Sequence, residues 1–168
     1  MRPIHTSLFL ALCLASCGEP ERLTYRSGPV PLVATGPLVE GTNTAQGTWS
    51  TGVEAFLVEQ GHSLDQLQGA RLVGATIAGA DSSGLQGVRS ISVQWMDGAT
   101  GMHQVAVRNP LPADSATVVL TLANDQAKIA ELLRSGTLTV VADMDLDADS
   151  DSDRHVIGSF TLELTLDR

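Results

Sequence analysis

Residues 137–168 read TLTVVADMDLDADSDSDRHVIGSFTLELTLDR, and this stretch decides the fold class. Apolar side chains recur at every second position in both halves, which is typical of β-strands that bury one face. In the first half these are Leu138, Val140, Ala142, Met144 and Leu146, and in the second Val156, Phe160, Leu162, Leu164 and Leu166. Residues 147–154 join the halves, so we predict a C-terminal β-hairpin.

The same period continues upstream. Alternating or largely apolar runs at residues 49–57, 69–79, 89–97, 102–108 and 116–122 predict further strands. In the first run, Trp49, Thr51, Val53, Ala55 and Leu57 would share one face. Asp97-Gly98 is a turn sequence, so we expect residues 89–97 and 102–108 to pair as a hairpin.

One helix is predicted between residues 124 and 136. Asn124 is suited to the N-cap, and Gly136 to the position just after the C-cap. Apolar residues with helical spacing lie between them, namely Ile129, Leu132 and Leu133. We therefore predict a mainly β fold, an antiparallel β-sandwich of about seven strands with one short α-helix before the C-terminal hairpin.

The N-terminus has the features of an export signal. Arg2 is followed by an apolar run over residues 7–16, SLFLALCLAS, which is too short to span a bilayer. The run ends Leu14-Ala15-Ser16-Cys17, which resembles the lipobox of bacterial lipoproteins. That resemblance implies cleavage before Cys17 and a membrane anchor of acyl chains, such as palmitate, on its thiol. The alternative is an ordinary signal peptide with an incidental cysteine.

The resemblance also implies a location. Gly18 follows the cysteine where an Asp would resemble an inner-membrane retention signal, so we expect the outer membrane rather than the inner membrane. We predict a signal peptide at 1–16, a lipidated cysteine with a Pro/Gly-rich tether at 17–37, and a β-sandwich domain at 38–168. The chain from Leu64 onward, with LLRSGTLTVVADMDLD before its end, resembles small uncharacterised β-sandwich lipoproteins of Gram-negative bacteria. That resemblance implies a fold and no activity.

The charge and the cysteine content of the chain limit its possible partners and covalent bonds. The chain has 10 basic residues against 19 acidic ones, a net charge of −9, which argues against binding to nucleic acid. Its 2 cysteines, Cys13 and Cys17, lie in the signal and at the lipid site, so no thiol remains for a disulfide.

The most regular polar feature is a series of aspartates at every second residue. Asp143 begins it, and we predict a calcium site on the remainder, namely Asp145, Asp147, Asp149, Asp151 and Asp153. Closely spaced carboxylates repel one another, and a hard divalent cation with oxygen ligands would relieve that repulsion. The spacing is not that of an EF-hand, because Ser150 or Ser152 stands where Gly is required. The alternative is a solvated hairpin tip whose charge prevents edge pairing.

No catalytic motif is complete. Gly61-His62-Ser63-Leu64-Asp65 approaches the nucleophile elbow of α/β-hydrolases, but Asp65 replaces its final Gly. We expect Ser63 to cap a short turn through Leu67, and the protein not to be an enzyme. The histidines at positions 62, 103 and 155 lack zinc-ligand spacing.

These observations favour a non-enzymatic cell-envelope lipoprotein that acts as an interaction or structural module. We expect it to contact the membrane through its lipid and an envelope protein through its domain. The alternative is a lipoprotein that binds a small molecule or lipid between its sheets. A cavity lined by Val, Leu and Trp would favour this alternative, whereas a filled core and an exposed patch would favour the interaction module. We expect Trp95 to pack in the core, because it continues the face of Ile91 and Val93.

Overall fold

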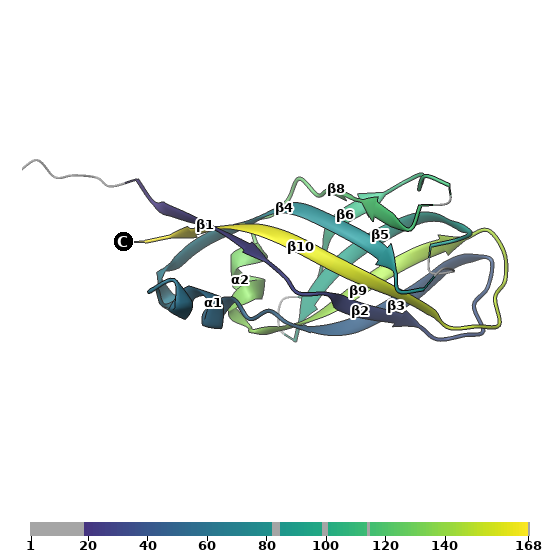
Figure 1. Cartoon of the computed structure of the whole chain (residues 1–168), viewed down its shortest axis with the longest axis horizontal. Helices are drawn as coiled ribbons and strands as arrows, with labels where there is room; N and C mark the ends of the chain where they lie inside the picture. The colour runs from purple at the N-terminus through teal and green to yellow at the C-terminus, as the bar shows by residue number, and fades with distance from the viewer. Residues whose placement is uncertain (1–18, 82–84, 99–100, 114, 168) are drawn as a thin grey trace, which may run out of the picture.

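The computed structural model describes residues 19–81, 85–98, 101–113 and 115–167, and most of its regular structure is β-strand (Figure 1). Its strands are β1 (Glu21–Arg26), β2 (Val30–Ala34), β3 (Gly41–Ser50), β4 (Leu67–Gly79), β5 (Val88–Asp97), β6 (Gly101–Arg108), β7 (Thr117–Val119), β8 (Thr121–Leu122), β9 (Thr137–Leu146) and β10 (Arg154–Leu166). The helices are α1 (Val53–Glu59), α2 (Ile129–Arg134) and a 3-10 turn, η1 (Leu64–Gln66). The predicted β class is confirmed, with more strands than expected.

The strands form a nearly closed barrel. Over the described residues they make one ten-stranded sheet in the order β7-β4-β10-β2-β3-β9-β5-β6-β8, with β1 also on β10, and every pairing is antiparallel. β7 and β8 are separated only by Leu120, whose N–H donates to the Ala75 carbonyl of β4 at 2.9 Å. One run of chain therefore pairs with β4 and then with β6, which brings the two ends of the sheet together.

The two C-terminal strands are confirmed, but the hairpin between them is wrong. β9 pairs with β3 and β5, whereas β10 pairs with β1, β2 and β4. In the sheet order β2 and β3 lie between them. The alternation of residues 137–168 determined which side chains face inward but carried no information about which strand edge lay next to which. The hairpin predicted from Asp97-Gly98 does form, between β5 and β6.

The predicted tether is wrong for residues 21–34. β1 and β2 pair one after the other along β10, from Glu21 opposite Leu166 to Ala34 opposite Arg154. They contribute four buried side chains to the core, namely Tyr25, Val30, Leu32 and Ala34. The prolines had indicated a tether rather than a strand. Pro31 nevertheless lies exposed within β2, on the side of the strand where β2 shares only one registered pair, with β3. A proline is tolerated where its missing N–H is not needed by a ladder.

The strand predicted over residues 49–57 is also wrong in its second half. β3 ends at Ser50, Gly52 adopts a left-handed conformation with φ 65°, and α1 follows. Val53 and Leu57, both buried, stand four residues apart, and this spacing fits one face of a helix as well as one face of a strand. The period of two was therefore ambiguous over so short a run.

The helix α2 is confirmed, and it begins later than predicted. Lys128 rather than Asn124 occupies the N-cap position, while Gly136 has the expected positive φ of 74°. The buried face of α2 covers the part of β4 beyond the β7 pairing, and the side-chain oxygen of Gln126 accepts the Leu72 N–H at 2.8 Å. A helix rather than a strand therefore covers the barrel at this end (Figure 1).

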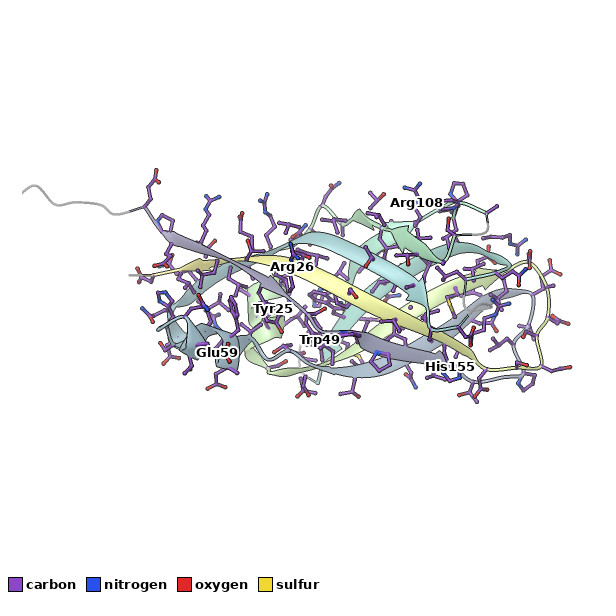
Figure 2. All side chains as sticks on the ribbon, viewed as in Figure 1. Tyr25, Arg26, Trp49, Glu59, Arg108 and His155 are labelled. Atoms are coloured by element: carbon purple, nitrogen blue, oxygen red, sulfur yellow. The ribbon has the colours of Figure 1, made fainter. Side chains whose placement is uncertain are left out.

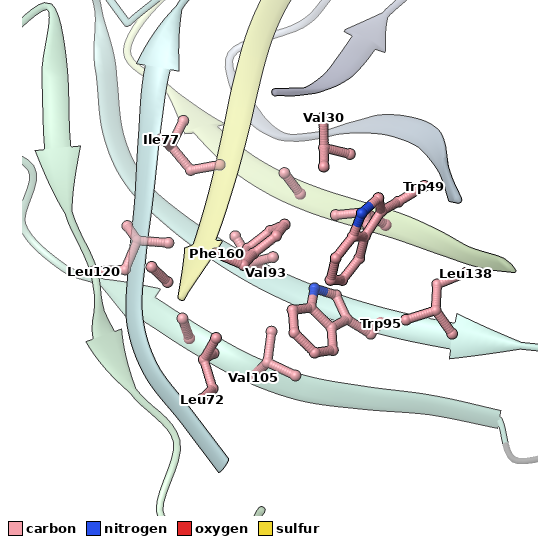
Figure 3. Packing of buried hydrophobic residues seen from close by; sticks show 14 of the residues in the cluster. Val30, Trp49, Leu72, Ile77, Val93, Trp95, Val105, Leu120, Leu138 and Phe160 are labelled. Carbon is pink, nitrogen blue, oxygen red and sulfur yellow. The ribbon is translucent and has the colours of Figure 1, made fainter. Parts of the chain in front are cut away.

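Aliphatic side chains fill most of the barrel interior, and aromatic side chains pack together among them (Figure 3). Trp95 is fully buried, as predicted, and its ring centroid lies 5.1 Å from that of Trp49 and 5.0 Å from that of Phe160. Among the described residues the indole N–H of Trp95 has no conventional acceptor. Figure 3 shows its nitrogen-bearing edge directed at the Trp49 ring, an arrangement in which an N–H···π contact takes the place of a hydrogen bond.

Candidate functional site

Different segments of the chain form the two ends of the barrel (Figure 1). The start of β1, the end of β10 and helix α1 gather at one of them (Figure 1). The loops 35–40 and 147–153 meet at the other, which we call the distal end, where Leu38 and Ser150 exchange backbone hydrogen bonds of 2.8 and 3.0 Å. Figure 2 shows Glu59 at the first end and His155 near the distal end. Cys17, the predicted lipid site, lies outside the described residues.

Two of the six aspartates hold the distal loops together. Asp149 accepts the backbone N–H of Glu40 at 2.6 Å, and Asp153 accepts that of Gly36 at 2.8 Å. Carboxylates that accept backbone N–H groups form strong, charge-assisted hydrogen bonds. These aspartates therefore stabilise the crossing of loop 147–153 over loop 35–40.

Two more aspartates lie on the outer face of β9. Asp143 accepts hydrogen bonds from the Thr44 hydroxyl and the Gln94 amide, both at 2.7 Å. Asp145 forms an ion pair with Arg89 at 3.0 Å, and the same guanidinium donates to the Leu146 carbonyl at 2.9 Å. Each carboxylate is thus engaged by side chains from the neighbouring strands.

The calcium site predicted on these aspartates stays a prediction. In the part of the chain that the structure describes, no group of three or more His, Cys, Asp or Glu side chains is placed to hold a metal ion. Asp145, Asp147, Asp149, Asp151 and Asp153 are not brought together around one point. Strand geometry separates the first of them, and Asp149 and Asp153 turn toward different backbone groups in loop 35–40.

A pocket of about 750 Å³ opens at the distal end instead. Three described segments line it, namely residues 85–89, residues 109–113 and the β9 end with Asp145 and Asp147. The Leu111 N–H donates to the Arg89 carbonyl at 2.8 Å, and the Asp147 N–H donates to the Gly87 carbonyl at 2.9 Å. These two bonds fix the segments relative to one another. Sequence reasoning missed the pocket because its walls are far apart along the chain.

A second, smaller pocket of about 420 Å³ lies between β6 and the segment leading into α2. Met102 is 53% exposed beside it, and Ile129 and Leu132 lie in its wall. Trp95, the other residue flanking the β5–β6 turn, is buried and contributes nothing to this surface. The apolar character of the turn therefore comes from Met102.

His62 adjoins Ser63 in the loop before η1, whereas His103 and His155 lie on other elements. Ser63 caps η1, as predicted, with its N–H donating to the Gln66 side-chain oxygen at 2.8 Å. His62 lies 3.4 Å from the carboxylate of Glu21. His103 belongs to β6 and His155 to β10.

Burial alters the titration of Tyr25. Its hydroxyl donates to the Thr51 carbonyl, and its side chain packs against Phe56 with ring centroids 5.2 Å apart. Burial raises the pKa of the Tyr25 phenol above its ordinary value of 10.0. This hydrogen bond connects β1 to the segment between β3 and α1, so it serves the fold.

Comparison with known proteins adds little. No protein-family model matches the chain, and no curated protein matches it. A solved chain from Desmodium yellow mottle tymovirus aligns with 99% of this chain and 93% of its own length, at 13% identity and a TM-score of 0.29. A likeness this weak carries no argument about fold or function. No helix among the described residues is long and apolar enough to cross a membrane.

Proposed function

We propose that the protein is a non-enzymatic, lipid-anchored protein of the cell envelope whose barrel acts as an interaction module. The filled interior is the observation that carries the choice of module. Trp49, Trp95 and Phe160 occupy the space where a carrier protein would hold its ligand, with ring centroids 5.0 to 5.4 Å apart. What remains for recognition is the outer surface and its pockets.

The proposed anchor places the barrel close to the membrane. β1 begins at Glu21, four residues after Cys17, a distance of about 14 Å at full extension. With so short a link, the end that carries α1 would face the bilayer and the distal end would point away from it. We place the protein at the outer membrane, on the resemblance of Cys17-Gly18 to lipoprotein sorting, with an envelope protein as its partner.

Metabolic labelling tests the anchor. We would express the full chain in a Gram-negative bacterium with an alkyne-bearing palmitate analogue and compare C17S with C13S, a matched cysteine change within the predicted signal. We expect label in the unchanged protein and in C13S, and none in C17S. Label that persists in C17S, or is absent from the unchanged protein, would overturn the anchor.

Native mass spectrometry tests the choice between module and carrier. The protein, purified from membranes and released from detergent, is expected at the mass of residues 17–168 and their covalent lipid alone. A stoichiometric additional lipid or small molecule would instead favour a carrier.

A further inference from the structure

We infer that the free edge of β1 accepts an extended, acidic segment of a partner protein as an additional antiparallel strand. This inference rests on the proposed function for its choice of a protein partner, and it names how the module would recognise that partner. Unpaired backbone groups on β1 point to an extended chain, and two arginines beside them point to acidic side chains.

β1 pairs with β10 on one side and with no other described strand. Its six residues pair without a bulge, and the Ser27 N–H continues this ladder by donating to the Phe160 carbonyl at 2.8 Å. Because backbone groups point to alternate sides along a strand, those of Arg22, Thr24 and Arg26 face away from β10. No hydrogen bond joins the backbone of these three residues to another described element. An extended chain lying alongside β1 would therefore find donors and acceptors at all three positions.

The side chains that flank this edge are basic. Arg22 and Arg26 are exposed on the outer face of β1, and Arg26 has no ion-pair partner among the described residues. Arg22 lies 3.6 Å from Glu163, which Arg71 of β4 also contacts at 3.3 Å. Where β1 faces β10 and β4, three guanidinium groups thus accompany one carboxylate, although the whole chain has a net charge of −9. Acidic side chains opposite Arg22 and Arg26 would form cross-strand ion pairs.

The same arginines disfavour pairing between two copies of β1. In an antiparallel pair centred on Thr24, Arg22 of each copy would lie opposite Arg26 of the other, and like charges directly opposite are destabilising. Natural edge strands use charge in this way to prevent self-association. The edge is therefore selective, because it repels a second copy and attracts an acidic strand.

The other face of the incoming strand would be apolar. Alternate side chains of β1 point inward, where Tyr25 is buried and Leu23 packs against the core. Phe56 of α1, whose ring centroid lies 5.2 Å from that of Tyr25, is partly buried at the same place. The segment that fits is therefore acidic at two positions four residues apart, with apolar residues at the first and third positions between them.

The probe is the peptide acetyl-TEVTVET-amide, which has this pattern. Binding is followed by ¹⁵N–¹H correlation spectra and amide hydrogen exchange of residues 18–168, which contain every described helix and strand and the whole core. In the free protein the amide of Thr24 should exchange rapidly, unlike those of Leu23 and Tyr25, which bond to β10. The peptide should shift the amides of β1 and slow the exchange at Thr24.

Methylation of one peptide nitrogen separates edge pairing from other contacts. N-methylation of the central threonine removes an N–H that would face β1, whereas N-methylation of a neighbouring valine removes one that would face solvent. We expect the first change to weaken binding at least about fivefold relative to the second. A peptide with lysines in place of the two glutamates should bind at least about threefold more weakly than the probe.

R26E tests the charge of the edge, and R108E is its matched control, because Arg108 lies on β6, away from β1 (Figure 2). R26E should weaken binding of the glutamate peptide at least about threefold and strengthen binding of the lysine peptide, whereas R108E should change neither. Thermal melts show whether both variants fold. If R26E does not, the methylated peptides decide the question on the unchanged protein.

Equal binding of the two methylated peptides, equal binding of the glutamate and lysine peptides, or slow exchange at Thr24 in the free protein would each overturn the inference. Exchange at Thr24 that slows as the protein alone is concentrated would show that a second copy occupies the edge, and this result would overturn it too. Because the chain tested carries no lipid, failure here is independent of the labelling result at Cys17.

Discussion

Replacing Leu32 with alanine tests whether residues 30–34 belong to the barrel. Leu32 is fully buried in β2, opposite Val156 of β10. The substitution removes three carbon groups from the core, and at about 0.8 kcal/mol each their transfer free energy is about 2.4 kcal/mol. A residual cavity adds to this, so we expect the free energy of unfolding to fall by about 3 to 4 kcal/mol. A residue in a solvated tether would lose almost nothing.

The assay is urea unfolding of residues 18–168, followed by the fluorescence of the two buried tryptophans, Trp49 and Trp95. The control is V39A, which shortens a side chain that is 58% exposed in the next loop and should cost less than about 0.5 kcal/mol. A loss below about 1 kcal/mol in L32A, or a loss as large in V39A, would refute the placement of β2 in the core.

Three further predictions concern the fold and the distal loops. G47A should destabilise the protein by about 1 to 3 kcal/mol in urea unfolding, because a Cβ there would stand 2.1 Å from a carbonyl of β2, whereas G28A, with open space around it, should not. The free energy of unfolding should fall as pH rises above 10.0, because Tyr25 loses its proton in the unfolded protein at its ordinary pKa but keeps it to higher pH when buried. Y25F should lose this pH dependence, and at neutral pH it should lower the free energy of unfolding by about 1 kcal/mol because the hydrogen bond to Thr51 is lost. In thermal melts D153N should lower the melting temperature and D151N should not, while added calcium should leave the unchanged protein unaffected; a rise of several degrees would contradict the geometry of the tip.

The sequence supported local conclusions well. The alternation in β5, β9 and β10 correctly identified strands and their buried faces, and Trp95 was correctly placed in the core. Helix α2 followed from the spacing of its apolar residues and Gly136 from the C-capping rule, although the predicted N-cap, Asn124, was wrong. It supported less about the candidate site, because the Asp147 carboxylate acquires its pocket from residues 85–89 and 109–113.

Strand period and turn residues act over a few positions, so the sequence by itself determined the β class, most strands and the inward-facing side chains. Pairing is a choice among strand edges, and many edges offer the same backbone groups. Only the tertiary structure decided that β1 and β2 join β10 rather than forming a tether, and that β2 and β3 lie between β9 and β10. Closing the barrel satisfies most of these edges and buries the aromatic core together, and neither condition is visible within one segment.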